Sequence, residues 1–208
     1  MPTGRRLEPG HAPRPAYSRP VVFYGTSITQ GACASRPGMV HTAILRRAFD
    51  RPVVNLGFSG QGKMDLAMAS LLGEIDAAVY VVDCLPNMNG ALVAERALPF
   101  AKELRRLRPD TPIVFVEDRS FTNSWIRPER RRHHADSRSA LMAAVEEMFD
   151  AGLSGIHHVP GEDLLGDDAE GGVDGSHPND LGFLRQADAL AVALAPLLQA
   201  EEQRREGK

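Results

Sequence analysis

Near the carboxyl end of the chain, Asp174 stands three residues before His177 in the segment GGVDGSHPNDLGF. At this spacing in a tight turn, a carboxylate can accept a hydrogen bond from one imidazole nitrogen and leave the other nitrogen free as a base. A serine hydroxyl needs such a base, because it is a poor nucleophile until its proton is removed. Ser27, in YGTSITQG, follows an apolar run near the other end of the chain. The three residues predict acyl-transfer chemistry, and the competing interpretation is that Ser27 and Asp174 only cap backbone groups in turns.

Two other segments offer hydrogen-bond donors for the oxyanion that acyl transfer creates. NLGFSGQG is a glycine-rich turn in which Gly60 can present a bare backbone N–H, and DCLPNMNG contains Asn87, whose side-chain amide is a neutral donor. An asparagine in a turn that contains proline is more often structural, since its side chain can satisfy local backbone groups. We therefore consider Gly60 and Asn87 as oxyanion donors because each follows an apolar segment, as Ser27 does.

The glycine turn also supports a different interpretation. Gly57 to Lys63 fits the first seven positions of a phosphate-binding loop, and the apolar run AAVYVVD ends in an acid, as a magnesium-binding strand would. The residue after Lys63 in such a loop should be Ser or Thr to hold magnesium, but it is Met64. A P-loop-like nucleotide-binding protein therefore remains only the weaker alternative, since it would also leave Ser27 and the acid and histidine pair without a purpose.

The candidate residues follow segments that predict strands, and helical patterns separate these segments. Because the apolar runs are continuous, they predict strands that are covered on both faces, and the alternation of strand and helix predicts an α/β fold with a parallel sheet. Ligands of such folds bind beyond the carboxyl ends of the strands. A flavodoxin-like binding domain without catalysis would have the same pattern. The predicted strands are 21–25, 53–57, 77–83, 112–118 and 155–161, and the predicted helices are about 39–49, 64–73, 90–107, 128–151 and 179–200.

Length and composition narrow the class of protein. With 208 residues, 43% hydrophobic and 25% charged residues and a net charge of -3, the chain predicts one soluble globular domain without the basicity of a nucleic-acid-binding protein. We saw no apolar run near the roughly 20 residues of a membrane helix and no signal peptide, so we expect a cytoplasmic protein without a membrane partner. Two cysteines do not make a disulfide framework, and no spacing predicts a metal site.

Domain boundaries follow from where the alternation of predicted strands and helices begins and ends. Residues 1–19, rich in Pro and Arg, predict a tail or linker, before which a further domain could be missing. Residues 20–200 hold the predicted catalytic domain, and residues 201–208 predict a charged tail. We expect no chemistry from two polar segments. The loop that contains Asp118 and Arg119 should be solvated or salt-bridged, and His134 should lie on a solvated basic face of a helix.

Taken together, these segments resemble the SGNH, or GDSL-like, hydrolases. GTSITQG resembles that family's serine block, NLGFSGQG its glycine block, LPNMN its asparagine block and DGSHPNDLGF its final block, in the right order between about Val21 and Pro196. The sequence departs from the family in Thr26, where an Asp is usual, and in the Pro-Asn-Met of the third block. The resemblance implies a three-layer α/β/α sandwich with a five-stranded parallel sheet, as in flavodoxin-like folds.

The resemblance also implies roles for individual residues. Ser27 would be the nucleophile, His177 the base and Asp174 the residue that orients it, while Gly60 and Asn87 would donate to the oxyanion together with the Ser27 amide. It implies a serine esterase for small acyl esters, acetyl esters first, including carbohydrate O-acetyl esters, with no cofactor and no metal. The alternative within this chemistry is a lysophospholipase or thioesterase type of acyl hydrolase.

Overall fold

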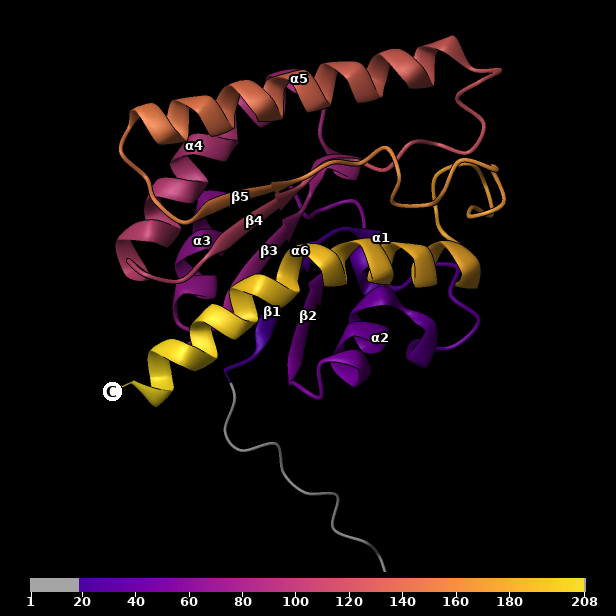
Figure 1. The fold of residues 1–208 in the computed structure, drawn as a ribbon. Coiled ribbons are helices and arrows are strands. Elements are labelled where there is room, and N and C mark those ends of the chain that lie inside the picture. Colours follow the sequence, from indigo (N-terminus) through magenta and orange to yellow (C-terminus); the bar gives the residue numbers. More distant parts are fainter. Residues whose placement is uncertain (1–18, 208) are drawn as a thin grey trace, which may run out of the picture.

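Five parallel strands form the centre of the molecule in the order β2-β1-β3-β4-β5 (Figure 1). The structure is a computed structural model that describes residues 19–207. The three inner strands are buried along their whole length, which explains their continuous apolar sequences. The elements are β1 Val21–Gly25, α1 Ser27–Gln30, η1 Pro37–Met39, α2 His41–Ala48, β2 Val53–Gly57, α3 Leu66–Gly73, β3 Val79–Asp83, η2 Leu85–Asn87, α4 Gly90–Leu107, β4 Ile113–Val116, α5 Pro128–Asp150, β5 Ile156–Val159 and α6 Asp180–Glu206.

Helices cover both faces of the sheet, so the fold is the predicted three-layer α/β/α sandwich (Figure 1). On one face, α3, α4 and α5 pack against the side chains of Tyr24, Tyr80 and Phe115. On the other face, α2 and α6 pack against Phe23 and Val81. Alternate residues of each strand thus enter two separate cores, and burial of their apolar surface holds the layers together.

The predicted elements agree with the structure except at their ends. All five predicted strands are present, and α4 has the predicted bounds of 90–107. The charged tail predicted from residue 201 is wrong in part, because α6 continues to Glu206 and buries Glu201, whose carboxylate lies 3.3 Å from the Arg51 guanidinium. The predicted start of this helix at residue 179 is one residue early, since α6 begins at Asp180 and Asn179 caps it by accepting from the backbone N–H of Gly182. The predicted tail 1–19 lies outside the described residues except for Arg19.

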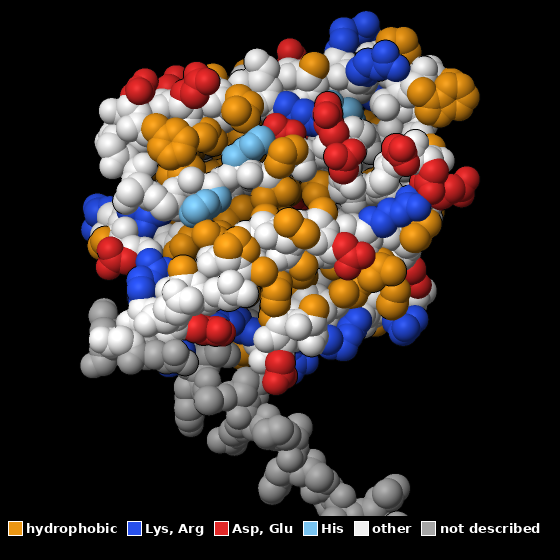
Figure 2. Space-filling model, in the orientation of Figure 1, with side chains coloured by type: hydrophobic (Ala, Val, Ile, Leu, Met, Phe, Trp, Pro, Cys, Tyr) orange, Lys and Arg blue, Asp and Glu red, His pale blue; other side chains and the backbone are white. Residues whose placement is uncertain are grey.

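Helix α6 crosses the face of the molecule that Figures 1 and 2 display. By length and composition alone, Asp180–Arg205 would be able to cross a membrane. One side of this helix packs in the core through residues such as Leu190 and Leu194, while Leu184 and Val192 are exposed. Figure 2 shows the resulting group of hydrophobic side chains in the middle of this face, with most charged side chains nearer its edges.

The carboxyl ends of three neighbouring strands lie in one row. Gly25, the last residue of β1, pairs with Gly57 of β2 on one side and with Asp83 of β3 on the other. The segments that follow these three residues are the serine, glycine and asparagine blocks of the sequence. The parallel register therefore brings the three predicted blocks to the same edge of the sheet.

The first residue of α2, His41, is a buried histidine held between aromatic rings. It stacks on Phe183 at 5.8 Å, meets Phe23 edge to face at 5.5 Å, and neither ring nitrogen has a hydrogen-bond partner among the described residues. Burial, and then the positive charge of Arg119, lowers the pKa of His41 to about 3, so the ring is neutral in the folded protein.

Replacing His41 by phenylalanine should therefore change how stability depends on pH. Between about pH 6.5 and pH 3 the unfolded chain binds a proton at His41 that the folded protein does not, so the free energy of unfolding decreases as the pH falls. The His41→Phe variant removes this contribution. Thermal unfolding at pH 7 and pH 4.5 should show a smaller drop in melting temperature for the variant than for the wild type, and an equal drop would contradict the assignment.

Candidate active site

Ser27 is the first residue of the short helix α1, directly beyond the end of β1. The helix is capped by Thr26, whose side-chain oxygen accepts a hydrogen bond from the backbone N–H of Ile28 at 3.2 Å. Capping is thus done by the residue before Ser27, which leaves the Ser27 hydroxyl free for another partner. Ser27 therefore does not cap this turn, contrary to the competing interpretation of the sequence.

Glycines at the strand ends let α1 sit directly on the edge of the sheet. A Cβ atom on Gly25 would lie 2.1 Å from Oγ1 of Thr29, and one on Gly57 would lie 2.1 Å from the backbone nitrogen of Gln30. Neither position has room for a side chain. These two glycines of the sequence blocks are thus explained by the close approach of a helix, which needs no ligand.

The predicted serine, histidine and aspartate form a continuous chain of hydrogen bonds. Nε2 of His177 lies 3.0 Å from Oγ of Ser27, although the two residues are 150 positions apart in the sequence. Nδ1 of the same imidazole lies 2.7 Å from Oδ2 of Asp174. These distances are those of a nucleophile, a base and the group that orients the base. The final sequence block therefore reaches the serine block in the folded chain.

Asp174 is held by its own turn in a way that fixes the protonation of the imidazole. Its Oδ1 accepts the backbone N–H groups of Ser176 at 2.9 Å and His177 at 2.8 Å. Although partial burial raises the pKa of Asp174, the hydrogen bonds from the His177 backbone, the His177 ring and the Ser176 backbone lower it to about 2. Because the carboxylate is ionised, Nδ1 of His177 must be the donor of the 2.7 Å bond, and a neutral ring then turns the lone pair of Nε2 toward Ser27.

The three residues lie at the surface. The side chains of His177 and Asp174 are 29% and 52% exposed. Their loop is attached to the segment after β4, where the backbone N–H of Thr122 donates to the carbonyl of Gly175 at 2.9 Å. Water can reach the imidazole in this arrangement.

Gly60 lies in a turn that packs against the end of β1. The backbone N–H of Phe58 donates to the carbonyl of Gly25 at 2.9 Å, and a Cβ on Gly62 would lie 2.0 Å from that carbonyl oxygen. Gly60 itself has a φ of 69°, in the left-handed region that favours glycine, and a Cβ built there would meet nothing within 4 Å. Its backbone N–H donates to none of the described residues, so it is free to bind an oxygen atom.

Asn87, at the end of η2, lies next to the same turn. Its Nδ2 donates to the carbonyl of Gly62 at 3.3 Å, which leaves the second N–H of the amide available. The neighbouring Asn89 has the structural role that we expected of asparagines in this turn, since it caps α4 by accepting from Leu92 at 2.9 Å. The structure thus brings the glycine and asparagine blocks together and separates the roles of the two asparagines.

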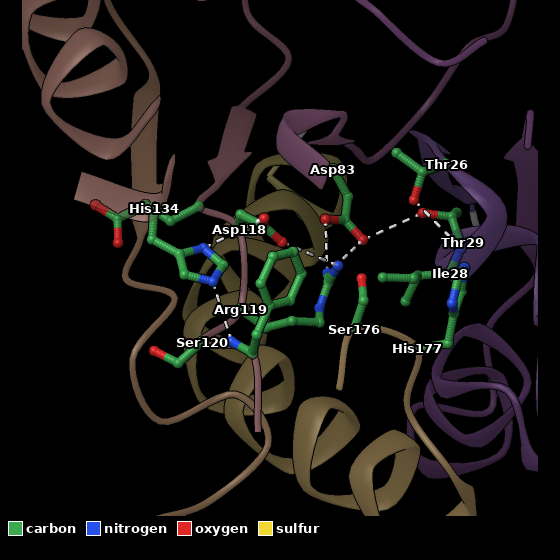
Figure 3. Close-up of polar contacts among 12 residues, drawn as sticks. Thr26, Ile28, Thr29, Asp83, Asp118, Arg119, Ser120, His134, Ser176 and His177 are labelled. Atoms are coloured by element: carbon green, nitrogen blue, oxygen red, sulfur yellow. Dashed lines mark hydrogen bonds and ion pairs between the residues drawn. The ribbon is translucent and has the colours of Figure 1, made fainter. Parts of the chain in front are cut away.

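A buried polar network below α1 was not predicted. The Arg119 guanidinium donates to both carboxylate oxygens of Asp83, at 2.8 and 3.1 Å, and Thr29 of α1 donates to the same carboxylate (Figure 3). Asp118 lies near Arg119 on one side and near Nδ1 of His134, at 3.4 Å, on the other. Of the two alternatives expected for the loop, the salt-bridged one is present and the solvated one is not, because Asp118 and Arg119 are fully buried and Arg119 pairs with Asp83. The expectation of a solvated histidine is wrong, because His134 is 4% exposed.

The same contacts exclude the phosphate-loop interpretation. Met64, at the position of the magnesium ligand, is buried in the core, and α3 begins only at Leu66. Asp83, the acid that would hold the metal from the neighbouring strand, is buried and paired with Arg119. Neither residue can bind a metal next to the glycine turn.

Comparison with known proteins supplies the family. A model of the GDSL-like Lipase/Acylhydrolase family matches residues 18–195. None of the curated proteins matches the chain. Among solved structures, a protein from Bacteroides ovatus described as a GDSL-like lipase is 36% identical with a TM-score of 0.84, and the match covers 88% of this chain and 54% of that protein.

Two more distant structures share the fold. The salicylyl-acyltransferase SsfX3 from a tetracycline biosynthetic pathway is 21% identical over 88% of this chain and 56% of its own, with a TM-score of 0.72. A family two carbohydrate esterase from Clostridium thermocellum is 16% identical over 88% of this chain and 65% of its own, with a TM-score of 0.67. The chain thus spans 54 to 65% of the length of these three proteins. Because the family model matches from the first strand into the last helix, this chain belongs to the GDSL-like lipase/acylhydrolase family.

Proposed function

We propose that the protein is a serine esterase that hydrolyses small acyl esters. The observation that carries this proposal is the chain of hydrogen bonds from Ser27 through His177 to the ionised carboxylate of Asp174. It gives the serine a base, and it gives the base a partner that stabilises the imidazolium formed when the proton moves.

The reaction follows from the positions of these atoms. Oγ of Ser27 attacks the ester carbonyl carbon while its proton passes to Nε2 of His177. Collapse of the tetrahedral intermediate breaks the bond to the alcohol, which leaves with the proton from Nε2. A water molecule then gives a proton to Nε2 and attacks the acyl group, and the acid is released as Ser27 regains its proton. The backbone N–H groups of Ser27 and Gly60 and the Asn87 amide would stabilise the two oxyanions.

We propose acetyl esters, including O-acetyl groups of carbohydrates, as the substrate class. A carbohydrate esterase has the same fold as this chain, and the half-buried His177 and the exposed Asp174 support a site open to bulky polar alcohols. A panel of aryl acetate, butyrate and longer esters beside acetylated sugars tests the class. A preference for long acyl chains or thioesters would favour the lysophospholipase or thioesterase alternative.

Labelling with a fluorophosphonate, followed by peptide mapping, tests the mechanism directly. We expect one modified residue, Ser27, and loss of ester hydrolysis in proportion to labelling. A folded protein that hydrolyses esters with Ser27 unlabelled would overturn the proposed mechanism, and a folded protein that neither reacts nor hydrolyses any ester would overturn the proposed function.

Replacing Asn87 by alanine should lower kcat by roughly 100-fold to 1,000-fold, because loss of one oxyanion donor costs about that much. The KM should change little, since the donor binds the transition state more strongly than the substrate. The control is Asn89→Asp, which retains an oxygen to cap α4 and should keep kcat within about threefold. An Asn87→Ala variant with the wild-type kcat would remove this residue from the site.

A further inference from the structure

Helix α1, which carries the proposed nucleophile, depends on contacts outside itself for its orientation. It has only four residues, and a helix of that length is not stable alone in water. Two side chains from other elements hold Thr29, two residues after Ser27. Asp83 accepts a hydrogen bond from its hydroxyl at 3.1 Å, and Nδ2 of Asn55 donates to its carbonyl at 2.6 Å.

Asp83 is in turn fixed by Arg119. The two side chains are 1% and 0% exposed, and two contacts of 2.8 and 3.1 Å join the guanidinium to the carboxylate. Figure 3 shows Thr29 and Arg119 reaching Asp83 from different directions, with Ser176 and His177 nearby. The Thr29 hydroxyl thus joins this pair to the helix that carries the proposed nucleophile.

Stability does not account well for this pair. A buried ion pair often stabilises a protein less than apolar residues of the same volume would. Moreover, Nε and Nη1 of Arg119 are buried without a hydrogen-bond partner among the described residues. Buried donors without a partner lower the free energy of unfolding, and proteins keep such unfavourable arrangements mainly where a function requires them.

We propose that Asp83 and Arg119 are positioning residues, which act through the Thr29 hydroxyl to keep α1 in the orientation that aims Ser27 at His177. This inference rests on the proposed serine esterase function. Asp83 is a suitable anchor because it ends β3, the strand that pairs with β1 below Ser27. A shift of about 1 Å in a reacting atom can slow a reaction on the order of 100-fold, so even a small tilt of α1 should be measurable.

The test is Thr29→Val, which keeps the shape of the side chain and removes its hydroxyl. We expect kcat to fall about 10-fold to 100-fold with KM within twofold of the wild type. Thr29→Ser, which restores the hydroxyl, should bring kcat back to within about threefold of the wild type. A purely structural role would lower the melting temperature without this split between kcat and KM.

Tyr80→Phe is the matched control, because it removes another buried hydroxyl, which donates to the carbonyl of Ile75 near the start of β3. It should lower stability and leave kcat unchanged. An active wild type with an unchanged kcat in Thr29→Val would overturn this inference alone, whereas a wild type without esterase activity would overturn the proposed function and this inference with it. Should Thr29→Val not fold, Thr29→Ala carries the same expectation, since it removes the same hydroxyl and places no additional methyl group beside the Asp83 carboxylate.

Discussion

A Ser27→Ala variant should hydrolyse acyl esters on the order of 10⁵-fold more slowly than the wild type, or below detection. Alanine removes the atom that attacks the substrate, and the 3.0 Å contact to Nε2 of His177 disappears with it. The fold should remain intact, because Thr26, and not Ser27, caps the helix. The measurement is kcat/KM on an aryl acetate, together with circular dichroism and the melting temperature.

Ser176→Ala provides the sharpest control for this prediction. Ser176 precedes the proposed base and also lies at the site in Figure 3, but only its backbone N–H takes part in the hydrogen bonds of the Asp174 turn. The variant should keep kcat/KM within about threefold of the wild type. If Ser176→Ala lost activity and Ser27→Ala kept it, the assignment of the nucleophile would be wrong.

The three inner strands could be predicted because each one is a short run of buried, mostly apolar residues. In a parallel sheet with both faces covered, almost every side chain of an inner strand enters a core, so VVFYG and VYVVD are continuous apolar sequences. The end of α6 could not be predicted in the same way. The charged sequence after Ala200 is typical of a solvated tail, and the ion pairs of Glu201 and Glu202 with Arg51 depend on how the chain folds.

The proposed catalytic residues could be predicted because each follows a strand or precedes a helix, where parallel topology gathers side chains. Ser27 and His177 could be paired without knowing the order of the strands in the sheet. The pairing of Asp83 with Arg119 could not be predicted without that order, since their contact depends on β3 lying beside β4. The sequence does place Asp83 at the end of one apolar run and Arg119 after the next run, which could have indicated their contact. The polar segment EDRSF suggested solvent exposure instead.

Burial of His134 escaped prediction for a related reason. Its segment, RRRHHADSR, is one of the most basic in the chain, and a helix with that composition is usually solvated. In the structure one side of α5 faces the loop after β4, where the backbone N–H of Phe121 donates to Nε2 of His134 at 3.0 Å. A local pattern records the average exposure of a helix, whereas the burial of a single residue depends on which loop covers it.

Asp174→Asn should lower kcat by about 10³-fold to 10⁴-fold with little change in KM. The substitution is informative because the two oxygens of Asp174 have different partners. Oδ1 accepts the two backbone N–H groups of the turn, which an asparagine oxygen can also do. Oδ2 accepts from Nδ1 of His177, and an asparagine would place an N–H donor there instead.

Two donors cannot face each other, so the imidazole of the variant should carry its proton on Nε2 and present that N–H to Ser27. A ring in this tautomer cannot take the proton of the serine hydroxyl. Asp167→Asn is the control, since it makes the same change of charge at an exposed position before the same turn and should keep kcat within about threefold. Equal losses in the two variants would mean that Asp174 acts only through its charge, whereas a loss confined to Asp174→Asn requires the directed bond to Nδ1.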